Sequence, residues 1–233
     1  RFHTQVAGVS LTAQQPMNNI ARVTIQALAA VCGGTQSLHT NSYDEALGLP
    51  TEESATVALR TQQIIAEESG AASVADPLGG SYLVEMLTDE IYDQARSKII
   101  EIEEMGGAMK AIEAGFQQRE IHEAAWKHLM QVESGDRKIV GVNHGVLAEE
   151  AMPPVLKPDP NLGLRQSEKL DKIRANRDDD SVSKSLQEIR ESAAKETNLF
   201  PLVIEALKHD CTLGEIISAM KDVFGTWMPP SGF

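Results

Sequence analysis

The sequence predicts an α/β protein in which short parallel strands alternate with helices. Three strand-like runs fall in the first third of the chain, over residues 2–7, 36–41 and 73–77, and a helical pattern follows each of them. The runs begin roughly 35 residues apart, a spacing typical of βα units. Such units build either a (β/α) barrel or a doubly wound sheet, and the pattern alone leaves both open.

The helices between these runs have recognisable ends. After the first run, apolar residues recur at helical spacing, namely Ile20, Val23, Ala27, Leu28 and Val31. Gly33-Gly34 then ends that helix. After the second run, Thr51 can cap a helix whose first turn carries Glu52 and Glu53, and both acids suit the positive helix N-terminus.

From Tyr82 onward the pattern is mainly helical. An apolar stripe runs as far as Ile102, and shorter helical patterns follow near 108–114 and 120–132. The run 138–143 is one more strand candidate.

A proline-rich segment separates this part from the rest of the chain. Residues 152–160 contain four prolines and predict an extended linker, because each proline removes a donor and fixes φ. Four helices are expected beyond it, the first two at about 163–178 and 181–196. The last begins with a capping box, Thr212 with Glu215.

The chain is acidic, with a formal net charge of −13. Such a chain repels phosphate backbones and anionic lipid, so we expect neither a nucleic-acid partner nor a membrane partner. Its two cysteines, Cys32 and Cys211, form no CxxC motif, which favours a reducing compartment, the cytosol or the mitochondrial matrix. The chain opens on Arg1-Phe2-His3, a sequence typical of the middle of a strand, so we expect the natural protein to continue upstream.

Polar residues gather where the predicted parallel strands end. They include His3, Thr4 and Gln5 on the first strand, Gln36, His39, Thr40 and Asn41 on the second, Asp44 and Glu45 in the loop after it, and Asp76 after the third. The carboxyl ends of strands line the active site in βα proteins. This cluster therefore predicts a polar site for a ligand rich in hydroxyl and amide groups.

Simpler explanations compete with this one. A single histidine near a strand end is more often a hydrogen-bonded structural residue. Neither His3 nor His39 has a carboxylate or a cysteine at ligand spacing, so no metal ligand is predicted. Gly33-Gly34 and Gly79-Gly80 match neither the dinucleotide nor the phosphate-loop pattern, and we interpret both as turns.

Longer motifs resemble those of the methylmalonyl-CoA mutase family of adenosylcobalamin-dependent acyl-CoA mutases. Residues 1–5, 10–12, 16 and 18–20 resemble the sixth barrel strand of that family and the loop after it; 28–31, 33–41 and 43–46 resemble the seventh; and 76–82 resemble the eighth. Residues 103–107, 111–113 and 139–143 also match. On these motifs the chain is identified as a member, the C-terminal part of a large subunit.

The resemblance implies a fold and a division of the chain. The fold class is α/β, the C-terminal part of a (β/α)8 TIM barrel followed by a helical extension. The expected parts are 1–100, the last three βα units; 101–150, helices and a strand that pack on the barrel; 151–162, the proline-rich linker; and 163–233, a helical region for subunit contacts. Three of eight strands cannot close a barrel, so the fragment alone is expected to be inactive.

The implied reaction is a radical isomerisation of an acyl-CoA substrate, with (R)-methylmalonyl-CoA converted to succinyl-CoA. Related mutases of isobutyryl-, 2-hydroxyisobutyryl- and ethylmalonyl-CoA share the quoted motifs and remain alternatives. The cofactor carries the radical step, while the protein positions substrate and excludes water. Carried over by position, the implied site is His3 and Gln5 as catalytic residues, Glu45 at the ribose of the adenosyl group, Gln36 and His39 in the same barrel mouth, and Leu49 near the upper face of the cofactor.

The resemblance also implies partners. The family's cobalt-binding Asp-x-His-x-x-Gly motif is absent, because His144 and His209 lack the required neighbours. We therefore expect the cobalt-binding histidine on a separate small cobalamin-binding subunit, with a mutase chaperone as a further partner. A hypothesis of another class makes the chain a non-catalytic assembly module whose residues 163–233 dock that subunit or chaperone. A third hypothesis is a different (β/α) enzyme with a coincidental match.

Overall fold

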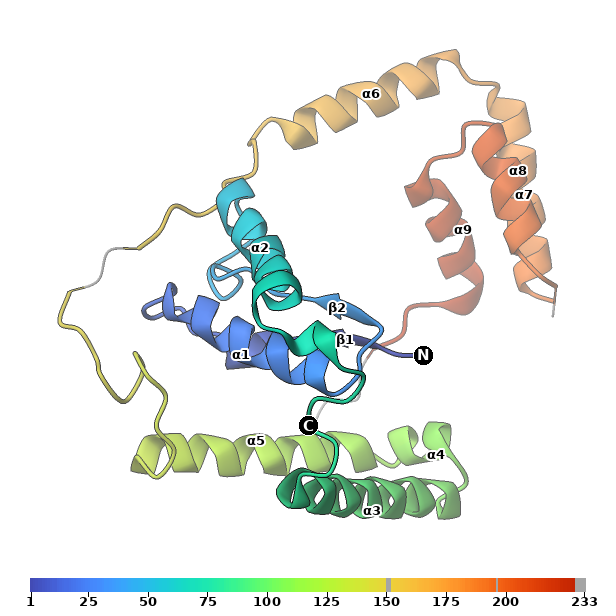
Figure 1. The fold of residues 1–233 in the computed structure, drawn as a ribbon. Helices are drawn as coiled ribbons and strands as arrows, with labels where there is room; N and C mark the ends of the chain where they lie inside the picture. Colours follow the sequence, from blue (N-terminus) through green and yellow to red (C-terminus); the bar gives the residue numbers. More distant parts are fainter. Residues whose placement is uncertain (150–151, 196, 229–233) are drawn as a thin grey trace. The chain divides into compact units, whose positions relative to one another are not determined.

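The computed structural model describes residues 1–149, 152–195 and 197–228, and the chain divides into two compact units. The first unit spans Arg1–Leu156 and the second spans Lys157–Gly232. Each unit has a hydrophobic core of its own. Figure 1 shows the first unit from blue to yellow and the second from orange to red.

The first unit is a small parallel sheet with helices. Its elements are β1 (His3–Gln5), the 3-10 turn η1 (Gly8–Ser10), α1 (Asn18–Cys32), β2 (Ser37–His39), α2 (Glu52–Glu68), the 3-10 turn η2 (Ala71–Ser73), α3 (Tyr82–Glu104), α4 (Ala108–Glu113) and α5 (Phe116–Ser134). The strands β1 and β2 are parallel, with His3 beside Ser37 and Gln5 beside His39. Because α1 connects them, the predicted α/β class with a parallel βα unit is confirmed.

The two faces of this sheet differ. Leu38 packs against a core to which α1 contributes Val23 and Ala27 and α2 contributes Ile65. Successive side chains of a strand point to opposite faces. His3 and Gln5, with their partners on β2, therefore lie on the other face, which is exposed.

The strand expected over 73–77 does not form, and that prediction was wrong. Ala71–Ser73 forms the turn η2, and no strand is present over 74–81. A third strand needs free backbone groups on a neighbouring strand edge. On β2 the Leu38 carbonyl accepts a hydrogen bond from the side chain of Gln62 instead, at 3.3 Å.

The strand expected over residues 138–143 is also absent. Val140 forms only an isolated bridge with His144. Gly141 turns the chain with a φ of 88°. The Asn143 side chain accepts the Ile139 N–H at 2.7 Å, so local turn bonds replace a ladder.

Helix boundaries agree more closely with the sequence. Helix α1 ends directly before Gly33, and Gly34 has a φ of 80°. The Thr51 hydroxyl accepts the Ser54 N–H, which confirms the predicted cap of α2. Helix α5 begins at Phe116, earlier than predicted, because Gly115 adopts a left-handed conformation that separates it from α4.

The second unit is helical. It comprises α6 (Leu162–Asn176), α7 (Asp179–Ala193), α8 (Phe200–Lys208) and α9 (Leu213–Phe224). Buried residues of α7, α8, α9 and the turn between α8 and α9 form one core, Val182, Ile189, Ala206, Cys211, Ile216 and Ala219. The predicted capping box of Thr212 and Glu215 is present. Glu215 also accepts two hydrogen bonds from Arg177, each 2.8 Å long.

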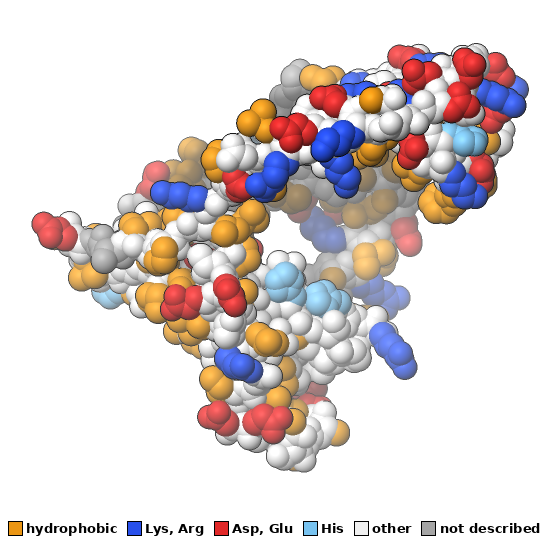
Figure 2. Space-filling model, turned by 90° about the horizontal axis from the view of Figure 1, so that it is seen from above, with side chains coloured by type: hydrophobic (Ala, Val, Ile, Leu, Met, Phe, Trp, Pro, Cys, Tyr) orange, Lys and Arg blue, Asp and Glu red, His pale blue; other side chains and the backbone are white. Residues whose placement is uncertain are grey.

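Apolar side chains are widely exposed in the first unit. Helix α3 has no buried residue, and on its predicted apolar stripe Ile91 is 65% and Ile99 is 57% exposed. Figure 2 shows hydrophobic side chains (orange) at the molecular surface beside the charged ones. None of the helices in the described part of the chain is long and apolar enough to cross a membrane.

Candidate functional site

A cavity of about 670 Å³ lies beside β2, where the strand, the loop that follows it and α2 meet. Four of the six predicted site residues line it, namely Gln5, His39, Glu45 and Leu49. Gln5 and His39 come from the last positions of the two strands, and Glu45 and Leu49 come from the loop. The structure therefore brings these four together at the carboxyl end of the sheet.

The other two predicted residues, His3 and Gln36, line a separate hollow with Arg1, Phe2 and Ser37. His3 begins β1, two residues or about 7 Å from its carboxyl end, and Gln36 directly precedes β2, three residues or about 10 Å from its carboxyl end. His3 Nδ1 is 2.7 Å from the Ser37 hydroxyl. Gln36 accepts the Phe2 N–H and donates to the Gly34 carbonyl, each at 2.7 Å, so its amide connects backbone segments near the strand starts.

Asn41 holds the side chain of Gln5. Gln5 Nε2 donates to Asn41 Oδ1 at 3.1 Å, and Asn41 Nδ2 donates to the Val6 carbonyl at 3.2 Å. Asn41 is only 2% exposed, which strengthens its bond to the Val6 carbonyl, whereas Gln5 is exposed. The Gln5 amide is thereby fixed at the rim of the cavity.

A glycine makes room for Glu45. A Cβ atom at Gly8 would lie 2.8 Å from Glu45 Oε1 and 2.9 Å from Asn41 Nδ2, which is closer than real Cβ contacts. The Glu45 carboxylate therefore lies against η1, the turn that follows β1. Any larger residue at position 8 would displace it.

Asp44 anchors the loop that carries Glu45 and Leu49. Its side chain is fully buried, and its Oδ2 accepts the Thr51 N–H at 3.2 Å. Burial tends to raise the pKa of Asp44, but the nearby hydroxyl groups of Ser42 and Ser54 and the Thr51 N–H outweigh it, so the pKa lies below its ordinary value. The carboxylate is therefore ionised at neutral pH.

Buried polar contacts complete the wall on the α2 side. The Thr40 hydroxyl donates to the Ala58 carbonyl at 2.7 Å, and Gln62 Nε2 donates to Thr40 Oγ1 at 3.0 Å. Sequence reasoning did not assign roles to Asp44 or Gln62, and it named Asn41 only as a member of the polar cluster. The signals for Asn41 and Asp44 in the sequence are their place in the polar run around the end of β2 and in the family motifs 33–41 and 43–46.

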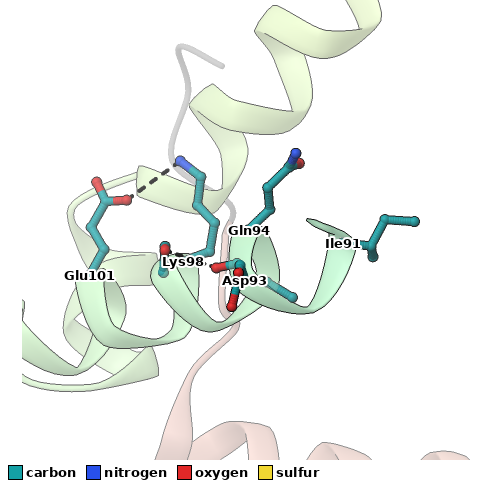
Figure 3. A pocket seen from close by; sticks show the side chains of 7 residues that line it. Ile91, Asp93, Gln94, Lys98 and Glu101 are labelled. Carbon is teal, nitrogen blue, oxygen red and sulfur yellow. Dashed lines mark hydrogen bonds and ion pairs between the residues drawn. The ribbon is translucent and has the colours of Figure 1, made fainter. Parts of the chain in front are cut away.

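One other hollow is confined to a single helix. Figure 3 shows this hollow, lined by Ile91, Asp93, Gln94, Lys98 and Glu101 together with two further residues, all from the single helix α3. Because it joins no residues of different elements, we assign no site there. Within residues 1–149, 152–195 and 197–228, no three His, Cys, Asp or Glu side chains are grouped so that they could hold a metal ion.

Comparison with known proteins now identifies the family. The family profile described as methylmalonyl-CoA mutase matches residues 1–226. The chain is 52% identical over 226 residues to a probable mitochondrial methylmalonyl-CoA mutase of Caenorhabditis elegans, with 96% of this chain and 30% of that protein covered. It is 47% identical over 233 residues to the methylmalonyl-CoA mutase of Escherichia coli strain K12, covering 99% of this chain and 32% of the relative.

A third relative has a different named activity. The large subunit of 2-hydroxyisobutanoyl-CoA mutase from Aquincola tertiaricarbonis is 44% identical over 229 residues, which cover 97% of this chain and 41% of that protein. This chain belongs to the methylmalonyl-CoA mutase family. It spans about 30% of the length of its first curated relatives.

Proposed function

We propose that this chain forms part of an adenosylcobalamin-dependent acyl-CoA mutase that converts (R)-methylmalonyl-CoA to succinyl-CoA. The observation that carries the proposal is the cavity at the carboxyl end of the parallel strands, where Gln5, His39, Glu45 and Leu49 meet. Membership of the mutase family supports the same activity.

The residues of the cavity fit an adenosyl group. Its volume of about 670 Å³ lies within the range of small-molecule sites. The Glu45 carboxylate can accept hydrogen bonds from ribose hydroxyl groups, and the Gln5 amide can both donate and accept. Leu49, Pro50 and Leu59 supply an apolar wall for a flat base.

When bound, adenosylcobalamin would supply the radical that takes a hydrogen atom from the substrate. In this proposal Glu45 binds the ribose and orients it. Gln5, fixed by Asn41, holds a polar group at the boundary between cofactor and substrate. Leu49 excludes water. His3 approaches the substrate from farther along the same sheet face, while His39 lines the cavity and Gln36 sets the spacing of the strand starts.

The proposed setting is a complete (β/α)8 barrel. Within the described residues β1 and β2 pair only with each other, so each strand has one edge without a strand partner. The exposed face of the sheet would then point into the barrel, and the exposed stripe of α3 would pack on further protein. The 163–233 region would contact a small cobalamin-binding subunit or a chaperone, and the enzyme would work in the cytosol or the mitochondrial matrix.

A second substrate is favoured by one observation. The relative named 2-hydroxyisobutanoyl-CoA mutase large subunit is nearly as similar to this chain as the methylmalonyl-CoA mutase of Escherichia coli. The residues that this chain shares with both relatives therefore do not determine which of the two acyl groups is the substrate. Assays of the complete protein with each acyl-CoA would decide, and we expect the higher kcat/KM with methylmalonyl-CoA.

A role of another class, a non-catalytic assembly module, is favoured by the second unit. That unit has its own core, and residues near its end remain exposed, with Trp227 at 79%. Such a unit can fold and bind a partner without the barrel. Failure of the complete protein to bind any acyl-CoA would favour this role.

The decisive test of the proposed function is a binding comparison in the complete protein. Glu45→Ala should weaken adenosylcobalamin about tenfold, because a charge-assisted hydrogen bond to the ribose is lost. It should leave hydroxocobalamin, which has no ribose at this position, nearly unchanged. Glu67→Ala, at the exposed end of α2, is the matched control and should affect neither.

Equal losses for the two cobalamins in Glu45→Ala would refute the ribose contact. An unchanged affinity for adenosylcobalamin would refute it as well.

A further inference from the structure

The loop between β2 and α2 is closed by a single residue at its beginning. The backbone carbonyl of Asp44 accepts hydrogen bonds from the Leu47 N–H at 2.8 Å and from the Gly48 N–H at 3.1 Å. Its side-chain Oδ2 accepts the Thr51 N–H at 3.2 Å. Three bonds from along the loop thus converge on one residue.

The same residue is fully buried although its side chain carries a charge. Asp44 is 0% exposed, and its second oxygen, Oδ1, has no hydrogen-bond partner in the part of the chain that the structure describes. A buried carboxylate is unfavourable unless it is well bonded. Any residue at position 44 would offer the backbone carbonyl, so the reason for a buried carboxylate is the one bond that its side chain accepts, from the Thr51 N–H.

The loop that Asp44 closes carries two residues of the cavity. Glu45 follows Asp44 directly. Leu49 lies between Gly48 and Thr51, whose N–H groups both donate hydrogen bonds to Asp44. Both side chains are exposed and line the cavity. Their positions are therefore set by the backbone of the loop.

We propose that Asp44 is a positioning residue that fixes the loop 45–50 so that Glu45 and Leu49 face the cavity. The inference rests on the proposed function, because Glu45 and Leu49 matter only if the cavity binds the adenosyl group. Asp44 itself does not reach the cofactor. It acts by removing alternative conformations of the loop before the ligand binds. Those conformations would reduce the apparent affinity for the ligand if they were populated.

A first experiment tests the loop without any cobalamin. Amide hydrogen exchange in the complete protein should rise most at Thr51 in Asp44→Ala, because its acceptor is lost, and less at Leu47 and Gly48, whose backbone acceptor remains but whose loop is released. It should remain unchanged in α1 and α7. Asp44→Asn keeps a carbonyl oxygen that can accept the Thr51 N–H, so it should restore most of the protection. Thr51→Val is the matched control, because it removes the hydroxyl cap of α2 but keeps the N–H that Asp44 accepts.

A second experiment tests the consequence for ligand binding. Asp44→Ala should weaken adenosylcobalamin about tenfold and hydroxocobalamin much less. In the double variant with Glu45→Ala the two losses should not add, because Asp44 acts through Glu45. Thr51→Val should not discriminate between the two cobalamins.

The outcomes separate the two proposals. Unchanged exchange over 45–51 in Asp44→Ala overturns the positioning role, and so do fully additive losses with Glu45→Ala. If Asp44→Ala does not fold, Asp44→Asn decides by the same readouts. If Glu45→Ala fails to distinguish the two cobalamins, the ribose contact fails, while the exchange data still decide whether Asp44 holds the loop.

Discussion

The two units of the chain differ in how fully each buries its own apolar residues. In the second unit Ile189, Ala206 and Ala219, from three different helices, are all fully buried. In the first unit the sheet has one open face, and Ile91 and Ile99 on α3 are exposed. The second unit therefore has a core shared by three helices, whereas the first has an open sheet face and an unburied helix suited to further protein.

The candidate site lies in the unit that has the open surfaces. The cavity is in the first unit, whose surfaces are open. Its polar framework is nevertheless local, since Asp44, Asn41 and Thr51 bond within a short stretch of chain and to the end of β1. These hydrogen bonds can therefore order the residues around the cavity even though neither outer edge of the sheet pairs with another strand in the described residues.

The largest predicted effect is on the core of the second unit. Ile189→Ala should lower the free energy of unfolding of that unit by about 3 kcal/mol, because a fully buried side chain leaves a cavity. Ile99→Ala on α3 should change the stability of this chain by less than about 0.5 kcal/mol. Urea unfolding followed by circular dichroism measures both, and equal losses would contradict the contrast between the units.

The next prediction concerns pH. Hydrogen bonds from Arg177 lower the pKa of Glu215 to about 2, against the smaller opposing effect of burial. A depressed folded-state pKa stabilises the fold above the unfolded value of 4.5, and this contribution is lost as the pH falls towards 2. We expect the second unit to lose about 2 kcal/mol between pH 6 and pH 2 through this pair.

Glu215→Gln is the control for that prediction. It should be less stable than the parent chain at pH 6, and the difference between the two should shrink as the pH falls. A difference in urea midpoint that stays constant from pH 6 to pH 2 would contradict the assignment.

The smallest predicted effect is on the cavity. Gly8→Ala should displace the Glu45 carboxylate and weaken adenosylcobalamin in the complete protein about fivefold, because the new Cβ would meet Glu45 Oε1. Gly163→Ala, in open space on α6, is the matched control and should leave binding unchanged. Isothermal titration measures both, and an unaltered affinity in Gly8→Ala would show that Glu45 is free to move.

Local features of this fold could be predicted from the sequence, and non-local ones could not. The cap at Thr51 and the capping box at Thr212 depend on residues three positions apart, and both are present. The strand expected over 73–77 depends on a distant pairing partner, and it is absent. An apolar run indicates a strand only if a neighbour with free backbone groups is available.

The candidate site shows the same division. The polar cluster at the strand ends predicts Gln5, His39 and Glu45, the family resemblance adds Leu49, and all four line one cavity. Burial and bonding reveal Asp44 as an anchor, and neither property can be seen in the letters of the sequence. The separation of His3 and Gln36 from the cavity also follows from their register at the start of the strands.

The most direct test is a structure of the complete protein with adenosylcobalamin bound. We predict that the adenosyl group lies in the cavity, with a ribose hydroxyl within hydrogen-bond distance of the Glu45 carboxylate and with the loop 45–50 unchanged. Adenosyl density elsewhere, with Glu45 facing solvent, would contradict the assignment of this cavity.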